Sequence, residues 1–112
     1  MPLAEQKEVY VEYVHNLYTI LAELRARHPK VEIESCSGGG ARVDLGILRY
    51  TDEVWPSDNT DPFDRLRIQN GFSYAYSPGL MMAWVTDSPG WMNDRSTSLE
   101  YRFLSSVQGS LG

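Results

Sequence analysis

The first quarter of the chain repeats apolar residues at intervals of three and four positions. These residues are Val9, Tyr10, Val14, Leu17, Leu21 and Leu24. Such spacing places them along one side of an α-helix. Because Pro2 precedes the stripe and Pro29 follows it, we expect one long helix over residues 4–28.

Beyond residue 30 the apolar residues come in short runs, separated by polar or glycine-rich stretches. The runs that favour strands are 31–35, 54–55, 72–76 and the start of another at 110–112. The segments that favour helices are 44–50, 62–71 and 98–108. We expect Thr60 or Asp61 to cap the second of these helices, Asn70-Gly71 to end it, and a loop to cover residues 77–97.

Helices and strands alternate in this interpretation, and a polar loop follows each strand. Alternation of this kind is typical of an α/β fold with a parallel sheet. The functional loops of such folds lie at the carboxyl ends of the strands. The loops after residues 35 and 55 are therefore the expected places for chemistry.

The composition argues against several classes of function. A chain of 112 residues suits one domain or a piece of a larger one, and a net charge of −5 argues against a nucleic-acid surface. No apolar run is long enough for a membrane span, and the first residues do not form a signal peptide. The single cysteine, Cys36, excludes an internal disulfide. We expect a cytoplasmic protein with no nucleic-acid or membrane partner.

The loop after residue 35 has the Cys-x5-Arg spacing of cysteine-dependent phosphatases. In those enzymes the loop N–H groups bind phosphate and a thiolate attacks it. Ser35 stands where the tyrosine phosphatases have a histidine, and Val43 replaces a hydroxyl residue after Arg42. The alternative is a tight glycine turn beside a small cysteine side chain. A pair between Arg42 and Asp44 is expected to hold the loop.

The loop after residue 55 concentrates acids and an aromatic ring in seven residues. Residues 55–61 read Trp-Pro-Ser-Asp-Asn-Thr-Asp and lie directly before the helix start. Such a cluster suits a polar site at the mouth of a fold better than a core. It lacks the periodic ligands and the distal glutamate of a calcium loop, so we expect no metal and no cofactor.

Both loops resemble segments of the microbial alpha-galactosidases of glycoside hydrolase family 36. Residues 34–44, Glu-Ser-Cys-Ser-Gly-Gly-Gly-Ala-Arg-Val-Asp, are similar to that family's Glu-Ser/Asn-Cys-x-x-Gly-Gly-Gly-Arg-Phe-Asp segment. Residues 55–61 are similar to its Trp-Thr-Ser-Asp-Asn-Thr-Asp segment. The resemblance covers nearly the whole chain. Its departures at Ala41, Val43 and Pro56 bear on the loop shape and on sugar contacts.

The resemblance implies a retaining alpha-galactosidase that hydrolyses terminal alpha-D-galactosyl residues of galactosides and galacto-oligosaccharides. Asp58 takes the place of the acid/base. Cys36 and Gly39 take places that touch the galactose ring, and Trp55 helps to wall the pocket. Asp61 is expected to be a cap or a brace instead. An alpha-galactoside is the implied partner, and the implied parent enzyme is a homo-oligomer.

The resemblance also implies an α/β fold class, a fragment of a (β/α)8 TIM barrel with roughly strands 5 to 7 and the start of strand 8. Residues 1–112 would form a partial catalytic domain that lacks the N-terminal half of the barrel and the last strand, since a closed barrel needs about 250 residues. The family's nucleophile lies in a Lys-Trp-Asp segment, which does not occur in this sequence. We expect the isolated chain to be inactive and prone to aggregate.

Two other functions stay open from the residues alone. One is the cysteine-dependent phosphatase, in which the Cys36 thiol would react rapidly near neutral pH. The other is a non-catalytic interaction module that uses loop aromatic residues such as Trp84 and Trp91. The same two tryptophans would equally suit the lining of a sugar site.

Overall fold

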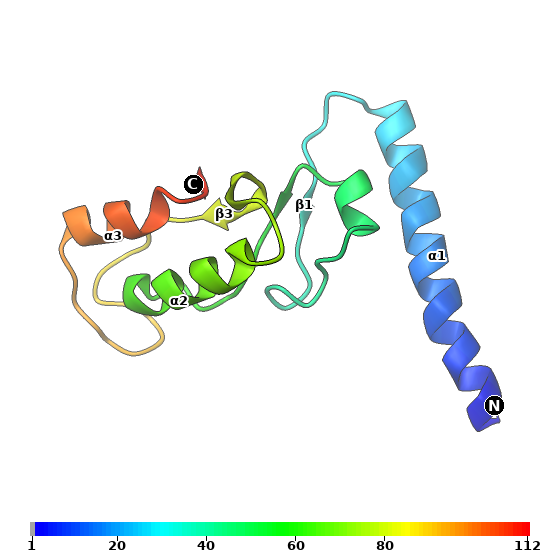
Figure 1. Ribbon diagram of the computed structural model, residues 1–112, viewed down its shortest axis with the longest axis horizontal. Helices are drawn as coiled ribbons and strands as arrows, with labels where there is room; N and C mark the ends of the chain where they lie inside the picture. Colours follow the sequence, from blue (N-terminus) through cyan, green and yellow to red (C-terminus); the bar gives the residue numbers. More distant parts are fainter. Residues whose placement is uncertain (1) are drawn as a thin grey trace.

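A computed structural model of the chain describes residues 2–112, in which helices alternate with very short strands (Figure 1). The elements are α1 (Leu3–Arg27), β1 (Glu34–Ser35), the 3-10 turn η1 (Ile47–Arg49), β2 (Glu53–Val54), α2 (Pro62–Ser73), the 3-10 turn η2 (Pro78–Leu80), β3 (Met82–Ala83), α3 (Leu99–Ser106) and β4 (Ser110–Leu111). No helix among residues 2–112 has the length and apolar character needed to cross a membrane.

All strand pairs among the described residues are parallel. β1 pairs with β2, with Ser35 opposite Val54, and β3 pairs with β4. A single parallel bridge between Val54 and Met81 joins the two pairs. Parallel strands joined through helices or turns form an α/β arrangement, which confirms the predicted class.

The long first helix is confirmed, and only the middle of its apolar stripe faces the rest of the chain. Leu17 and Leu21 line a narrow cavity together with Ile33 and Ile47, whereas Val9, Tyr10, Val14 and Leu24 are exposed. Arg25 fastens the end of α1 to the strand region. Its guanidinium donates to the carbonyl oxygens of Val31 at 2.7 Å and Tyr50 at 2.8 Å, and it pairs with Asp52.

The helix α2 begins where a capping residue was predicted. The Asp61 carboxylate accepts the backbone N–H groups of Phe63 at 3.1 Å and Asp64 at 3.0 Å, and Pro62 fills the first helical position. The predicted end at Asn70-Gly71 is wrong, because α2 continues to Ser73. Gly71 is exposed with open space around it, so the helix passes through it without hindrance.

The predicted strand over 72–76 is wrong. Phe72 and Ser73 are the last residues of α2, and the N–H groups of Ala75 and Tyr76 bond back to the Phe72 carbonyl. The rings of Phe72 and Tyr76 stack one helical turn apart, with centroids 5.2 Å apart. Alternating apolar residues in that segment imitated a strand.

The actual third strand, β3, lies within the predicted loop of 77–97. Other predicted elements are in place but shorter: β1 occupies only the end of 31–35, and η1 only part of 44–50. Ser98 caps α3 with its hydroxyl, and β4 confirms the strand expected at the end of the chain.

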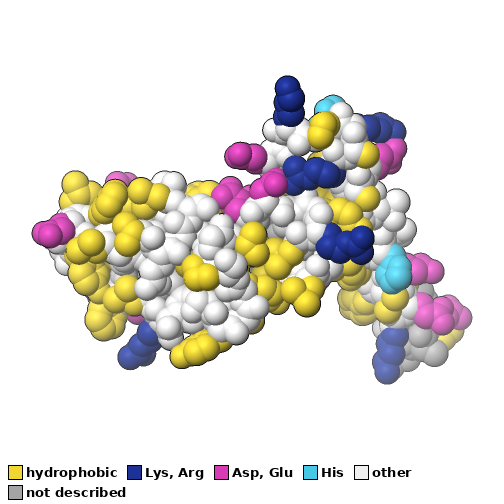
Figure 2. Space-filling view, turned by 45° about the horizontal axis from the view of Figure 1, so that its top comes forward, with side chains coloured by type: hydrophobic (Ala, Val, Ile, Leu, Met, Phe, Trp, Pro, Cys, Tyr) yellow, Lys and Arg dark blue, Asp and Glu magenta, His cyan; other side chains and the backbone are white. Residues whose placement is uncertain are grey.

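The buried interior is small and lies between the strands and α2. Its apolar members are Ile47, Val54, Trp55, Met81 and Ala83. Arg65 and Gln69 of α2 are buried beside them. Figure 2 shows apolar side chains on the surface of the half that holds α2 and α3, and Leu99, Phe103 and Leu104 of α3 are among the exposed ones. The loops after β1 and β2 therefore lie over a small buried core.

Candidate active site

The glycine-rich loop after β1 and the acidic loop after β2 are in direct backbone contact. Gly39 is buried with φ +76°, and a Cβ there would lie 2.9 Å from the Ser57 Cα and 3.0 Å from the Asp58 nitrogen. A Cβ at Gly40 would lie 2.5 Å from the Pro56 carbonyl oxygen. Glycine is required at both positions, because any side chain would push the loops apart.

Strand register explains why these two loops meet. Ser35 is opposite Val54, and the Trp55 N–H continues the ladder to the Ser35 carbonyl at 3.0 Å. The parallel strands therefore end at the same edge, and Cys36 follows beside Trp55. Of the predicted site residues, Gly39, Trp55 and Asp58 lie together at this edge. Cys36 follows β1 and lines the narrow cavity beside α1 with Leu17 and Leu21.

Asp58 presents an exposed carboxylate that is held through one oxygen. The indole N–H of Trp55 donates to Asp58 Oδ1 at 2.9 Å. Trp55 itself is only 7% exposed, so its donor comes from a packed and immobile ring. Asp58 does not cap α2, since Asp61 does. This combination leaves Asp58 oriented and open to a ligand.

Trp55 is the buried centre of the site. Its ring lies 4.5 Å from the ring of Trp84, which follows β3, and the guanidinium of Arg65 lies 4.9 Å from its centroid. Tryptophan rings and arginine guanidiniums pack well in such contacts because the ring face attracts cations. The carboxyl ends of β2 and β3 are therefore joined through aromatic packing.

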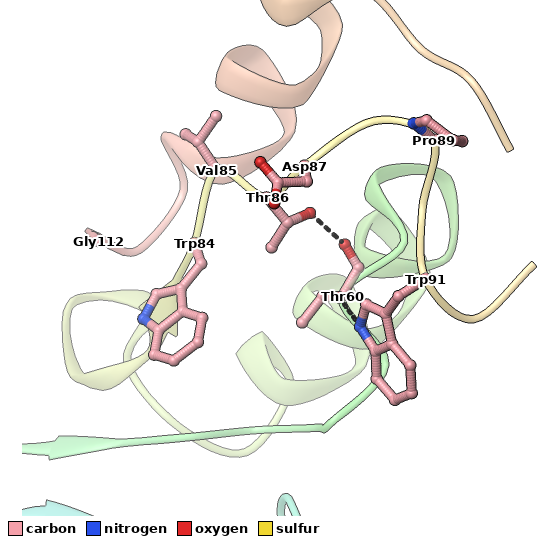
Figure 3. Close-up of a pocket in the computed structure, with 8 residues that line it drawn as sticks. All are labelled: Thr60, Trp84, Val85, Thr86, Asp87, Pro89, Trp91 and Gly112. Atoms are coloured by element: carbon pink, nitrogen blue, oxygen red, sulfur yellow. Dashed lines mark hydrogen bonds between the residues drawn. The ribbon is translucent and has the colours of Figure 1, made fainter. Parts of the chain in front are cut away.

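An open cavity of about 560 Å³ adjoins these residues (Figure 3). It is lined by Thr60, Trp84, Val85, Thr86, Asp87, Pro89, Trp91 and Gly112. Figure 3 shows the rings of Trp84 and Trp91 on two sides of Thr60. Thr60 is hydrogen-bonded to Thr86 and Trp91. Its carbonyl oxygen accepts from Thr86 Oγ1 at 3.2 Å, and its hydroxyl oxygen accepts from Trp91 Nε1 at 3.1 Å.

Asp61 connects the start of α2 to the loop that carries Trp91. Beyond its capping bonds it accepts from Asn93 at 3.1 Å and forms an ion pair with Arg95, while its side chain is 1% exposed. Burial raises the pKa of Asp61, but the N–H of Asp64, the Asn93 amide and the Arg95 charge outweigh it and hold that pKa below 3.8. Asp61 is therefore a cap and a brace, as predicted.

The cysteine loop does not form a phosphatase-like anion clamp with its arginine. Arg42 donates from Nη2 to the hydroxyl of Tyr13 on α1 at 2.9 Å, which draws its guanidinium towards the helix. The predicted Arg42–Asp44 pair is wrong: Asp44 instead accepts the hydroxyl of Tyr18 at 2.7 Å. Among residues 2–112 no group of three His, Cys, Asp or Glu side chains could hold a metal ion.

Sequence reasoning missed Arg65, Thr60 and the residues that hold Asp61. Arg65 lies in the first turn of α2, and its carbonyl partner on β3 is 17 residues away. Thr60 looked like a helix cap, but it joins the two walls of the cavity. Arg95 and Asn93 had no motif around them, because a long-range ion pair leaves no local pattern in a sequence.

Comparison with known proteins agrees with the motifs at this site. The family model described as Melibiase matches residues 1–112. Alpha-galactosidase 2 of Pediococcus pentosaceus is 46% identical over 112 residues, which are 100% of this chain and 16% of that enzyme. Alpha-galactosidase AgaA of Geobacillus stearothermophilus is 39% identical over 112 residues, with 15% of that enzyme covered.

Solved structures give the same result for the fold. The alpha-galactosidase of Lactobacillus brevis has a TM-score of 0.93 and 38% identity, covering 100% of this chain and 15% of that one. AgaA in complex with raffinose has a TM-score of 0.92 and 38% identity, covering 100% of this chain and 16% of that one. The chain thus spans about one sixth of the relatives it matches, and it belongs to the melibiase family.

Proposed function

We propose that this chain supplies the acid/base and one wall of the sugar pocket of a retaining alpha-galactosidase. In this proposal β1, β2 and β3 are strands 5 to 7 of a (β/α)8 barrel and β4 begins strand 8, roughly as the family resemblance implies. The nucleophile comes from outside these 112 residues, since no Lys-Trp-Asp segment occurs among them.

The observation that carries the proposal is the geometry of Asp58. An exposed carboxylate follows the strand β2 at the sheet edge where barrel enzymes place their catalytic groups. It is oriented by the indole of Trp55 and lies against the buried Gly39 turn. An acid/base must be held precisely and still reach the substrate, and this arrangement supports both needs.

The proposed reaction uses Asp58 twice. In the first step the nucleophile attacks the anomeric carbon, the glycosidic bond breaks, and Asp58 gives its proton to the departing oxygen. In the second step the Asp58 carboxylate takes a proton from water, whose oxygen attacks the same carbon and breaks the sugar–enzyme ester. Two displacements on one carbon retain its configuration, with the two carboxyl groups about 5–5.5 Å apart.

The neighbouring cavity supports a galactoside substrate. Its two tryptophans, Trp84 and Trp91, offer flat apolar surfaces that suit sugar rings, and Thr60, Thr86 and Asp87 offer polar groups. The structures of AgaA that match this chain include complexes with raffinose and with stachyose, both of which are that enzyme's ligands. We infer oligosaccharides with a terminal alpha-galactosyl group as the substrates here.

A hybrid enzyme tests this function. In it the 112-residue chain replaces the matching segment of the Pediococcus pentosaceus alpha-galactosidase 2. We expect the hybrid to hydrolyse raffinose, Asp58→Asn to lower kcat/KM by about 100-fold or more, and Cys36→Ser to keep activity within about ten-fold, since general acid catalysis contributes about 10²–10⁴-fold. A folded hybrid that keeps full activity with Asp58→Asn would contradict the assignment.

A further inference from the structure

Arg65 is a buried cation without a carboxylate partner among residues 2–112. It is 3% exposed, and none of the ion pairs formed within residues 2–112 includes it. Burial lowers the pKa of Arg65 to about 10, so it stays charged at neutral pH. Burying a guanidinium costs free energy unless protein hydrogen bonds replace those to water. The groups that bond Arg65 therefore indicate its role.

Two hydrogen bonds of the Arg65 guanidinium reach the loop after β2 and the strand β3, and another holds the guanidinium against Gln69. Nη1 donates to the Ser57 carbonyl at 3.2 Å and Nη2 to the Met82 carbonyl at 2.7 Å. Nε donates to Gln69 Oε1 at 3.2 Å, and Gln69 in turn donates to the Ser105 carbonyl of α3 at 2.6 Å. Gln69 of α2 thus links the Arg65 guanidinium to α3.

Two of the groups that Arg65 contacts, the Ser57 carbonyl and the Trp55 ring, lie next to Asp58. Ser57 immediately precedes Asp58, so the Nη1 bond fixes the backbone on one side of the carboxylate. Trp55 donates to the Asp58 carboxylate, and its ring lies 4.9 Å from the guanidinium. The Met82 carbonyl ties this loop to β3. One charged group therefore joins the loop after β2 to the strand β3.

We infer that Arg65 is a positioning residue for acid/base catalysis: it fixes the Ser57 carbonyl and the Trp55 ring so that Asp58 meets the glycosidic oxygen. This inference rests on the proposed function. Only a planar guanidinium reaches two carbonyls and stacks on a ring at once, so lysine is not equivalent here.

The test compares two leaving groups in the hybrid enzyme. Raffinose needs a proton on its departing oxygen, whereas the fluoride of alpha-galactosyl fluoride departs without one. We expect Arg65→Met to lower kcat/KM for raffinose by about 10- to 100-fold, because small misplacements of a catalytic group cost that much. The loss for the fluoride should be much smaller. Arg65→Lys should lie in between, and the exposed Arg67→Met on the same helix should change neither.

Folding and the acid assignment are checked separately. Thermal unfolding and circular dichroism show whether each variant is folded. If Arg65→Met is not folded, the comparison of the two substrates is made with Arg65→Lys. Equal losses on both substrates, no loss on either, or failure of both variants to fold would overturn the inference. Asp58→Asn must itself show the raffinose-selective loss; if it does not, the proposed function fails whatever Arg65 does.

Discussion

At the scale of single residues, the site depends on backbone contact between two loops. Gly39 and Gly40 leave no room for a side chain against residues 56–58. The contact brings Gly39 beside Asp58, although they are about 20 positions apart in the sequence. This contact therefore fixes the backbone of residues 57–58, and with it the position of Asp58.

Replacing Gly39 with alanine should therefore impair the hybrid enzyme more than the same change at Gly38. Gly39 and Gly38 have positive φ angles of +76° and +56°. Alanine at either position therefore carries the left-handed strain of about 1–2 kcal/mol. Only the Gly39 Cβ would meet backbone, 2.9 Å from the Ser57 Cα, whereas nothing lies within 4 Å of a Cβ at Gly38. We expect Gly39→Ala to lose at least about ten-fold in kcat/KM through displacement of Asp58.

Raffinose kinetics and urea unfolding of the two variants measure this difference. Gly38→Ala serves as the matched control for strain alone. Equal kinetics for the two variants would show that the loop contact does not position the site.

The sequence revealed the members of this site unevenly. Two motifs predicted Cys36, Gly39, Trp55 and Asp58, and the structure brings Gly39, Trp55 and Asp58 into contact. Arg65 was not predicted, since a buried arginine in a helix with carbonyl partners in a distant loop and strand has no local signature. Long-range hydrogen bonds depend on tertiary packing, which a pattern along one chain does not encode.

At the scale of elements, the start of α2 organises the loops around the cavity. Asp61 caps the helix and also binds Asn93 and Arg95, so one carboxylate joins α2 to residues 86–95. Thr60 adds bonds to Thr86 and Trp91. The wall that carries Trp91 is therefore attached mainly to the first turn of α2.

Asp61→Asn should destabilise the hybrid enzyme by about 1 kcal/mol at neutral pH. Asparagine caps a helix as well as aspartate does, so the loss comes from the charge of Asp61 at the helix N-terminus and from its ion pair with Arg95. The folded-state pKa of Asp61 is below its ordinary value of 3.8. Its ionised form therefore stabilises the fold above that pH, and this stabilisation is lost as the pH falls through the folded pKa. The difference between wild type and variant should shrink below about pH 4.

Urea unfolding of both proteins between neutral and acidic pH measures that difference. Asp94→Asn, at an exposed position in the same loop, is the control and should leave stability nearly unchanged at all pH values. A stability difference that does not depend on pH would contradict the role given to the Asp61 charge.

Elements were predictable where the pattern was long, and unpredictable where it was short. The stripe of α1 and the cap of α2 were found because each has a local physical cause. The strand β3 was missed since two residues, Met82 and Ala83, cannot show an alternating pattern. Conversely, Phe72, Tyr74 and Tyr76 alternate like a strand, although α2 runs to Ser73 and a turn follows it.

At the scale of the whole molecule, the chain is more extended than a compact domain of its size. Its radius of gyration is 16.8 Å, whereas a compact domain of this length has about 13 Å. α1 stands to one side in Figure 1. Val9, Tyr10 and Ile20 of α1 and Leu99 and Phe103 of α3 are exposed. Such faces need further structure to cover them.

The isolated 112-residue chain should therefore bind a hydrophobic dye, self-associate and show no galactoside hydrolysis. The hybrid enzyme should neither bind the dye nor self-associate, because the rest of the enzyme covers the same faces there. Dye fluorescence, sedimentation and raffinose assays on both proteins measure this. A monomeric, dye-free and cooperatively unfolding isolated chain would contradict the expectation.

The most direct measurement of the Asp58 role is chemical rescue of Asp58→Ala in the hybrid enzyme by azide. Without Asp58 no base activates water, so the glycosyl-enzyme formed from alpha-galactosyl fluoride should accumulate. Azide needs no base: its nitrogen attacks the anomeric carbon as the sugar–enzyme ester breaks. We predict faster turnover with azide and alpha-galactosyl azide as the product by NMR. A variant that azide does not accelerate, or that yields the beta anomer, would contradict Asp58 as the acid/base of a retaining enzyme.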